Sequence, residues 1–236
     1  MSNKSQKHIV SLGVGCGVAF HLEKLKLRQQ AYPLDYIWIK NLPNLRHILQ
    51  DDFNILLDQK YFVKVNKSDP KRIHHSFYDD ISQEFHATFA HHDILDSEMY
   101  NTFHNRVERF RSLKTESSLF ITFAMLVPVK MLSNLTINPN QEDATLEGQC
   151  KIFKDIVRIM RSQGYLKSRF MLILLKQSNT LGAESEMKLY DETNQYHIYI
   201  FTYVNDYIWG PFSGTDNEVM TQHLIQTTND FLTKRY

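Results

Sequence analysis

The sequence predicts a single α/β domain over residues 1–236, with a mainly parallel central sheet flanked by helices in a Rossmann-like three-layer arrangement. Three apolar runs, at 118–126, 169–175 and 196–204, have the continuous hydrophobicity of strands buried on both faces of a parallel sheet. Amphipathic patterns typical of helices span about 144–162 and 215–234. Because no internal repeat or long linker divides the chain, we expect one domain.

The first predicted strand is a short apolar run that leads directly into a helical pattern from Gly17 to Arg28. It ends in three glycines at alternate positions: Gly13, Gly15 and Gly17. Cys16 therefore lies at a strand-to-helix turn, where free backbone N–H groups and the helix dipole favour a thiolate. We expect the pKa of Cys16 to be lowered and the glycines to let a ligand approach the backbone closely. The alternative is a small cysteine packed beneath a tight turn.

The segment 32–39 then interrupts the helical pattern with a proline and with one carboxylate, Asp35, among large apolar groups. An unpaired buried carboxylate is costly, so we expect Asp35 to have a hydrogen-bonding partner. It is a candidate for a functional charge, and the alternative is a structural turn cap. The next helix is predicted to begin at Asn41.

The middle of the chain is rich in histidine, and short strands or irregular structure are expected there. The histidines concerned are His74, His75, His86, His91 and His92. Their spacing matches neither an HExxH helix nor a Cys/His zinc pair, so we expect no metal and no other cofactor. His92 followed by Asp93 is more informative, since an imidazole held by a carboxylate could take a proton from a thiol. Surface histidines without a function are the alternative.

A further helix is predicted from Ser97 through Leu113. Arg106 and Arg109 are three residues apart on it, so they share a face and could bind an anion together with the glycine turn and His91. Solvated or ion-paired arginines are the alternative.

Composition limits the classes of function. The formal net charge of +1 gives no field that would attract nucleic acid or an anionic membrane surface. The two cysteines, Cys16 and Cys150, are too few for a disulfide framework and lack CxxC spacing. The polar start of the chain has no secretory core. We therefore expect a cytoplasmic protein with no membrane or nucleic-acid partner, with leaderless export as the alternative. The oligomeric state does not follow from the sequence.

The spacing Gly13-Val14-Gly15-Cys16-Gly17 also fits the GxGxG turn of S-adenosylmethionine-dependent methyltransferases. The acidic residue that usually precedes that turn is absent, and Val18 occupies the last glycine position of a GxGxxG dinucleotide motif. A transferase that binds S-adenosylmethionine or a nucleotide is thus one alternative function. A non-catalytic interaction module is another.

Five short motifs occur in a fixed order along the chain. They are Ser11-Leu12-Gly13 with Cys16, Pro33-Leu34-Asp35-Tyr36-Ile37, His92-Asp93, Arg106-Val107-Glu108-Arg109-Phe110, and Leu119-Phe120-Ile121. Together they resemble a bacterial and viral family described as papain-like cysteine peptidases of unknown function. Ile94 and Thr122 depart from the phenylalanine and arginine usual in that family.

This resemblance implies a cysteine-dependent hydrolase, and it raises a papain-like α+β fold as the alternative to the parallel sheet. Cys16 would attack as a thiolate, His92 would act as base and then as acid, and Asp35 or Asp93 would orient the imidazole. Backbone N–H groups at Gly17 and at the following residue would receive the oxyanion. The substrate, a peptide or a small molecule, is not specified.

Overall fold

A computed structural model describes residues 7–13, 16–64, 72–79, 81, 87–125, 142–178, 184–203 and 214–233. Gly15 and His86, both named above, lie outside these ranges. The helices are α1 (Gly17–Lys24), α2 (Leu42–Gln50), α3 (Asn54–Leu57), α4 (Ser97–Ser112), α5 (Leu146–Ser162) and α6 (Gly214–Thr233). The strands are β1 (Lys7–Ser11), β2 (Phe62–Val63), β3 (His74–His75), β4 (Ser117–Met125), β5 (Arg169–Gln177), β6 (Glu186–Glu192) and β7 (Tyr196–Tyr203).

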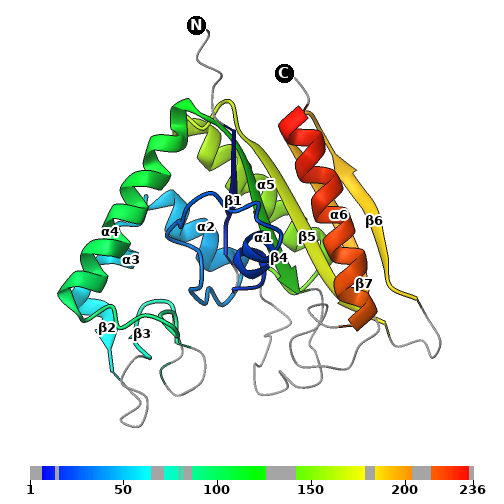
Figure 1. The fold of residues 1–236 in the computed structure, drawn as a ribbon. Helices are drawn as coiled ribbons and strands as arrows, with labels where there is room; N and C mark the ends of the chain where they lie inside the picture. Colours follow the sequence, from blue (N-terminus) through cyan, green and yellow to red (C-terminus); the bar gives the residue numbers. More distant parts are fainter. Residues whose placement is uncertain are drawn as a thin grey trace, which may run out of the picture.

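Five strands form one mostly parallel sheet with the order β1-β4-β5-β7-β6 (Figure 1). The first four are parallel to their neighbours, and β6 pairs with β7 in the antiparallel direction. The predicted strands at 118–126, 169–175 and 196–204 are confirmed within two residues. Strand β6 was not predicted, because a mostly exposed edge strand needs no apolar run. Strands β2 and β3 form a separate short ribbon.

Side chains alternate between the two faces of the sheet, so each face has its own core. One core joins the strands to α2, α3, α4 and α5, with Val10, Phe120, Phe170 and Leu172 among its strand residues. The other joins them to α1 and α6, with Ile9, Ile121 and Met171 on the sheet side. Helices therefore flank both faces, as predicted (Figure 1).

The strand order differs from that of dinucleotide-binding folds. In those folds the order reverses beside the first strand, and the ligand binds in the crevice created by the reversal. Here β1 lies at the edge, and the parallel strands follow in chain order. The fold is thus mixed α/β with a mostly parallel sheet flanked by helices, as predicted, and its strand order is not that of a dinucleotide-binding fold.

Side chains cap the starts of α2 and α4, and the start of α2 at Asn41 is as predicted. Asn41 accepts a hydrogen bond from the Asn44 N–H at 3.0 Å, and Asp96 accepts one from the Met99 N–H at 2.9 Å. Helix α1 ends at Lys24, four residues before the predicted end, and Lys26 has a φ of 55°. This early end lets the chain turn back across the sheet edge. No helix in the described part of the chain combines the length and apolarity that crossing a membrane requires.

Candidate functional site

The candidate site begins at Gly13, just beyond the carboxyl end of β1. Its φ of +80° is unfavourable for residues with a side chain. The Thr122 hydroxyl donates to the Gly13 carbonyl at 3.3 Å, which fixes the turn to β4. A Cβ atom on Gly13 would lie 3.4 Å from both Cβ and the carbonyl oxygen of Leu34. The glycine therefore lets the segment around Asp35 pack directly on the strand end.

We expect Gly13→Ala to destabilise the protein by about 1–2 kcal/mol, because alanine is strained at this φ. Urea unfolding measures the change. Gly17→Ala is the matched control, since Gly17 is the first residue of α1 and alanine is favoured in helices. Equal unfolding free energies for Gly13→Ala and wild type would contradict this role of Gly13.

Cys16 occupies the N-cap position of α1 and is partly exposed. Its carbonyl accepts the hydrogen bond of the Phe20 N–H at 2.9 Å. Burial raises the pKa of the Cys16 thiol, whereas its own backbone N–H lowers it to a smaller extent. The predicted lowering is therefore wrong, because the loss of hydration outweighs the favourable backbone field.

Asp35 is 1% exposed, as the apolar character of its segment predicts. Its Oδ2 accepts a hydrogen bond from the Tyr32 N–H at 3.0 Å and lies 3.4 Å from Nη1 of Arg28. Its Oδ1 is buried and has no hydrogen-bond partner among the residues that the structure describes. Burial raises the pKa of Asp35 to about 6, against the opposing effects of the Tyr32 N–H, Arg28 and Arg106.

The residues next to Asp35 tie its segment to α1. Tyr36 has a φ of 58°, and its hydroxyl donates to Glu23 of α1. The Arg28 guanidinium lies over the Tyr36 ring at 5.2 Å from the centroid, and its Nη1 is 3.6 Å from Glu23. These three residues were not singled out from the sequence. A strained aromatic residue after a buried carboxylate carries no local sequence signal, because only folding brings its partners together.

The segment leading to His92 lies against the Asp35 segment. The Trp38 N–H donates to the Thr88 carbonyl at 2.8 Å. Asp79 holds Thr88 from the other side, since its carboxylate accepts from both the N–H and the hydroxyl of Thr88 at 2.8 Å. His74 lies buried 3.7 Å from Asp79, so this part of the histidine-rich region has a structural role.

His92 is partly buried, and its Nε2 has no hydrogen-bond partner within the described ranges. Burial lowers the pKa of His92 to about 4, with further lowering by Arg106 and by the exposed His91. The neighbouring Asp93 accepts a hydrogen bond from the Leu95 N–H at 3.3 Å and thus caps a turn. Because its pKa is lowered to about 4, the His92 imidazole is neutral at physiological pH.

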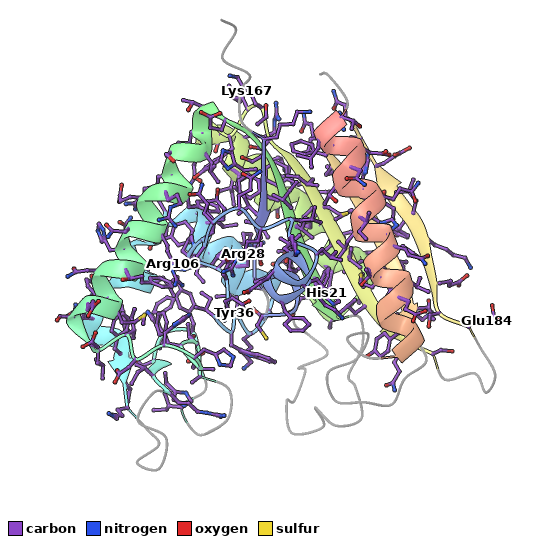
Figure 2. All side chains as sticks on the ribbon, in the orientation of Figure 1. His21, Arg28, Tyr36, Arg106, Lys167 and Glu184 are labelled. Atoms are coloured by element: carbon purple, nitrogen blue, oxygen red, sulfur yellow. The ribbon has the colours of Figure 1, made fainter. Side chains whose placement is uncertain are left out.

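Helix α4 directs its two candidate arginines toward these segments. Nη1 of Arg109 donates to the Ala31 carbonyl at 2.6 Å, which holds the chain just before the Asp35 segment. The charge of Arg106 acts on Asp35 and His92, and the positive charges of Arg28 and Arg109 act on Arg106. In Figure 2, Arg106, Arg28 and Tyr36 lie near one another between α4 and α1. Arg106 thus interacts electrostatically with both Asp35 and His92.

Four of the predicted site residues therefore form one electrostatic cluster: Asp35, His91, His92 and Arg106. Gly13 and Arg109 anchor the segment that carries Asp35. Among the described residues, however, no hydrogen bond joins Sγ of Cys16 to an imidazole nitrogen, and Gly17 makes no side-chain contribution.

Two other features of the described ranges bear on ligand binding. A cavity of about 70 Å³ lies at the amino-terminal ends of the strands, between the starts of β5 and β7 and the end of α6. None of the predicted site residues lines it. No group of three or more His, Cys, Asp and Glu side chains in these ranges is arranged to hold a metal ion.

Comparison with known proteins identifies a family that this chain matches. The sequence model of a family described as "Putative papain-like cysteine peptidase" matches residues 7–178, which confirms the resemblance predicted from the motifs. A curated relative, an uncharacterised protein of Acanthamoeba polyphaga mimivirus, is 36% identical over 45 residues. The alignment covers 19% of this chain and 20% of the viral protein, so the chain spans about a fifth of that relative. No solved structure matches the chain.

Proposed function

Because this chain belongs to the family described as "Putative papain-like cysteine peptidase", we propose that it is a thiol hydrolase whose nucleophile is Cys16. Its substrate would be a peptide or a small acyl compound. The observation that carries the proposal is the place of Cys16, which is partly exposed at the turn between β1 and α1. The second cysteine, Cys150, is buried in α5, where burial raises its pKa to about 11.

The pKa directions favour general-base catalysis over a preformed thiolate. The Cys16 thiol is protonated at neutral pH, and the His92 imidazole is neutral. Sγ of Cys16 would attack the acyl carbon while the thiol proton passes to Nε2 of His92. The leaving group would then take this proton, and water would hydrolyse the thioester to release the acid and restore the thiol.

Two further groups would assist the attack. The backbone N–H groups of Gly17 and Val18, at the start of α1, would receive the developing oxyanion. Neither candidate carboxylate bonds to the His92 imidazole within the described ranges, since Asp35 accepts from the Tyr32 N–H and Asp93 accepts from the Leu95 N–H. The proposal requires Cys16 and His92 to come within hydrogen-bond reach once substrate is bound.

Acylation of the full chain by p-nitrophenyl acetate tests the proposal. We expect release of p-nitrophenolate and an acetyl group on Cys16, identified by mass spectrometry of the proteolysed protein. Cys16→Ala should abolish this acetylation, and Cys150→Ala should retain it, because Cys150 is inaccessible. Equal acetylation of both cysteines, or none on Cys16, would overturn the proposed function.

A further inference from the structure

The cavity between the sheet and α6 is built from side chains of two elements that face each other. Its volume of about 70 Å³ has room for a molecule of a few non-hydrogen atoms. On the sheet side, Met171 of β5 pairs with His197 of β7. Because alternate strand residues share a face, Arg169 and Tyr199 lie on the same face as this pair, and α6 covers that face. On the helix side, the lining residues are three and four positions apart and so share one face of α6: Thr227, Asp230 and Phe231.

Hydrogen bonds hold both walls of the cavity in place. The Phe170 N–H donates to the Gln195 carbonyl at 3.0 Å, which fixes the turn between β6 and β7 to the start of β5. Nζ of Lys7 donates to the Phe231 and Leu232 carbonyls at 2.7 and 3.0 Å, which fixes the end of α6 to β1. The cavity is therefore preformed, and a ligand would not have to order these segments.

A chain of polar groups follows one side of the cavity. The Tyr199 hydroxyl lies 3.3 Å from Nδ1 of His197, and Nε2 of His197 lies 3.6 Å from its counter-charge, the Glu192 carboxylate. The Thr227 hydroxyl lies 3.4 Å from Nε2 of His223, whose ring packs against that of Tyr199 at 4.3 Å between centroids. A hydroxyl has one donor and two acceptor sites, so Tyr199 and Thr227 retain capacity for a bound molecule.

Two ionised side chains of opposite charge also line the cavity. Arg169 extends from the sheet and is half-buried, whereas Asp230 lies at the exposed end of α6. Burial lowers the pKa of His223 to about 4 and raises the pKa of Tyr199, so both of these groups are neutral at pH 7. Three lining residues are apolar and buried: Leu119, Met171 and Phe231.

We propose that this cavity binds a small α-amino acid. Its carboxylate would pair with the Arg169 guanidinium through two parallel hydrogen bonds. Its ammonium would donate to the Asp230 carboxylate and to the hydroxyls of Tyr199 and Thr227. A zwitterion matches both charges, whereas a simple carboxylate would meet the negative Asp230 and a simple amine the positive Arg169. The site is separate from Cys16, which follows the carboxyl end of β1, so the inference does not depend on the proposed function.

A two-dimensional NMR titration of the full-length protein tests the site with four probes: L-alanine, propionate, ethylamine and glycerol. We expect L-alanine to bind about tenfold or more tightly than the other three, because propionate and ethylamine each lack one charged group and glycerol lacks both. The amide signals that shift should belong to residues 193–199 and 227–231. A Kd for L-alanine weaker than about 10 mM, a smaller advantage over any other probe, or shifts centred elsewhere would overturn the proposal.

Arg169→Gln and Asp230→Asn should each weaken the binding of L-alanine about tenfold or more. The matched controls, Arg158→Gln and Glu218→Gln, remove the same charges from exposed positions on α5 and α6 and should bind like wild type. Thr227→Val keeps the size of the side chain, removes the hydroxyl and should also weaken binding, which provides a second variant if Arg169→Gln does not fold. Wild-type affinity in the folded Arg169→Gln or Asp230→Asn protein, or in Thr227→Val, would contradict the amino-acid site.

Discussion

Replacing His92 by glutamine is expected to slow acetylation of Cys16 by p-nitrophenyl acetate by about 10²- to 10⁴-fold. Glutamine is similar in size and polarity but cannot accept the thiol proton. The thiol of Cys16 has a raised pKa, so little thiolate exists at pH 7 to react without a base. The rate of p-nitrophenolate release, combined with mass spectrometry of the Cys16 peptide, measures the effect.

The matched control for this experiment is His104→Gln, which removes an exposed imidazole from α4 close to Arg106. Its acetylation rate should equal that of wild type. Adding free imidazole to His92→Ala should restore part of the rate, which a merely structural role of His92 would not predict. A His92→Gln rate within a factor of about two of wild type would refute the Cys16 and His92 pair.

Lowering the pH from 7 to 5 is expected to reduce the unfolding free energy through buried histidines. His21 of α1 is fully buried, with the rings of Phe20 and Phe123 at 5.9 and 6.3 Å. Burial, with a smaller effect of Lys24, lowers its pKa from 6.5 to about 4. The unfolded chain therefore binds a proton at pH 5 that the folded chain does not, which favours unfolding by roughly 2 kcal/mol. His92 and His223 act in the same direction.

His21→Phe should reduce the stability difference between pH 7 and pH 5 by about that amount, as measured by urea unfolding at both pH values.

Asp35→Asn should change the pH dependence of the unfolding free energy in the opposite direction. Because the pKa of Asp35 is raised to about 6, the folded chain takes up its proton first and is stabilised as the pH falls through 6. Asp35→Asn should therefore enlarge the loss of unfolding free energy between pH 7 and pH 5. An unchanged pH dependence in His21→Phe would show that His21 is not neutral in the folded protein.

Local patterns were sufficient for most of the secondary structure. The apolar runs of β4, β5 and β7 and the capping residues before α2 and α4 are signals carried by neighbouring residues. Strand β6 was missed because an exposed edge strand has no hydrophobic pattern. The ion pair between Asp35 and Arg28 could not be predicted, since Arg28 reaches Asp35 only through the early end of α1.

The sequence by itself determined the layered α/β class, the family and the turn that carries Cys16, because hydrophobic period, glycine spacing and motif order are all properties of contiguous residues. Only the tertiary structure decided the electrostatics of the site. Burial raises the pKa of Cys16 instead of lowering it, keeps His92 neutral and leaves Oδ1 of Asp35 without a hydrogen-bond partner among the described residues. Desolvation depends on which distant segments cover a group, and the order of residues along the chain does not contain that information.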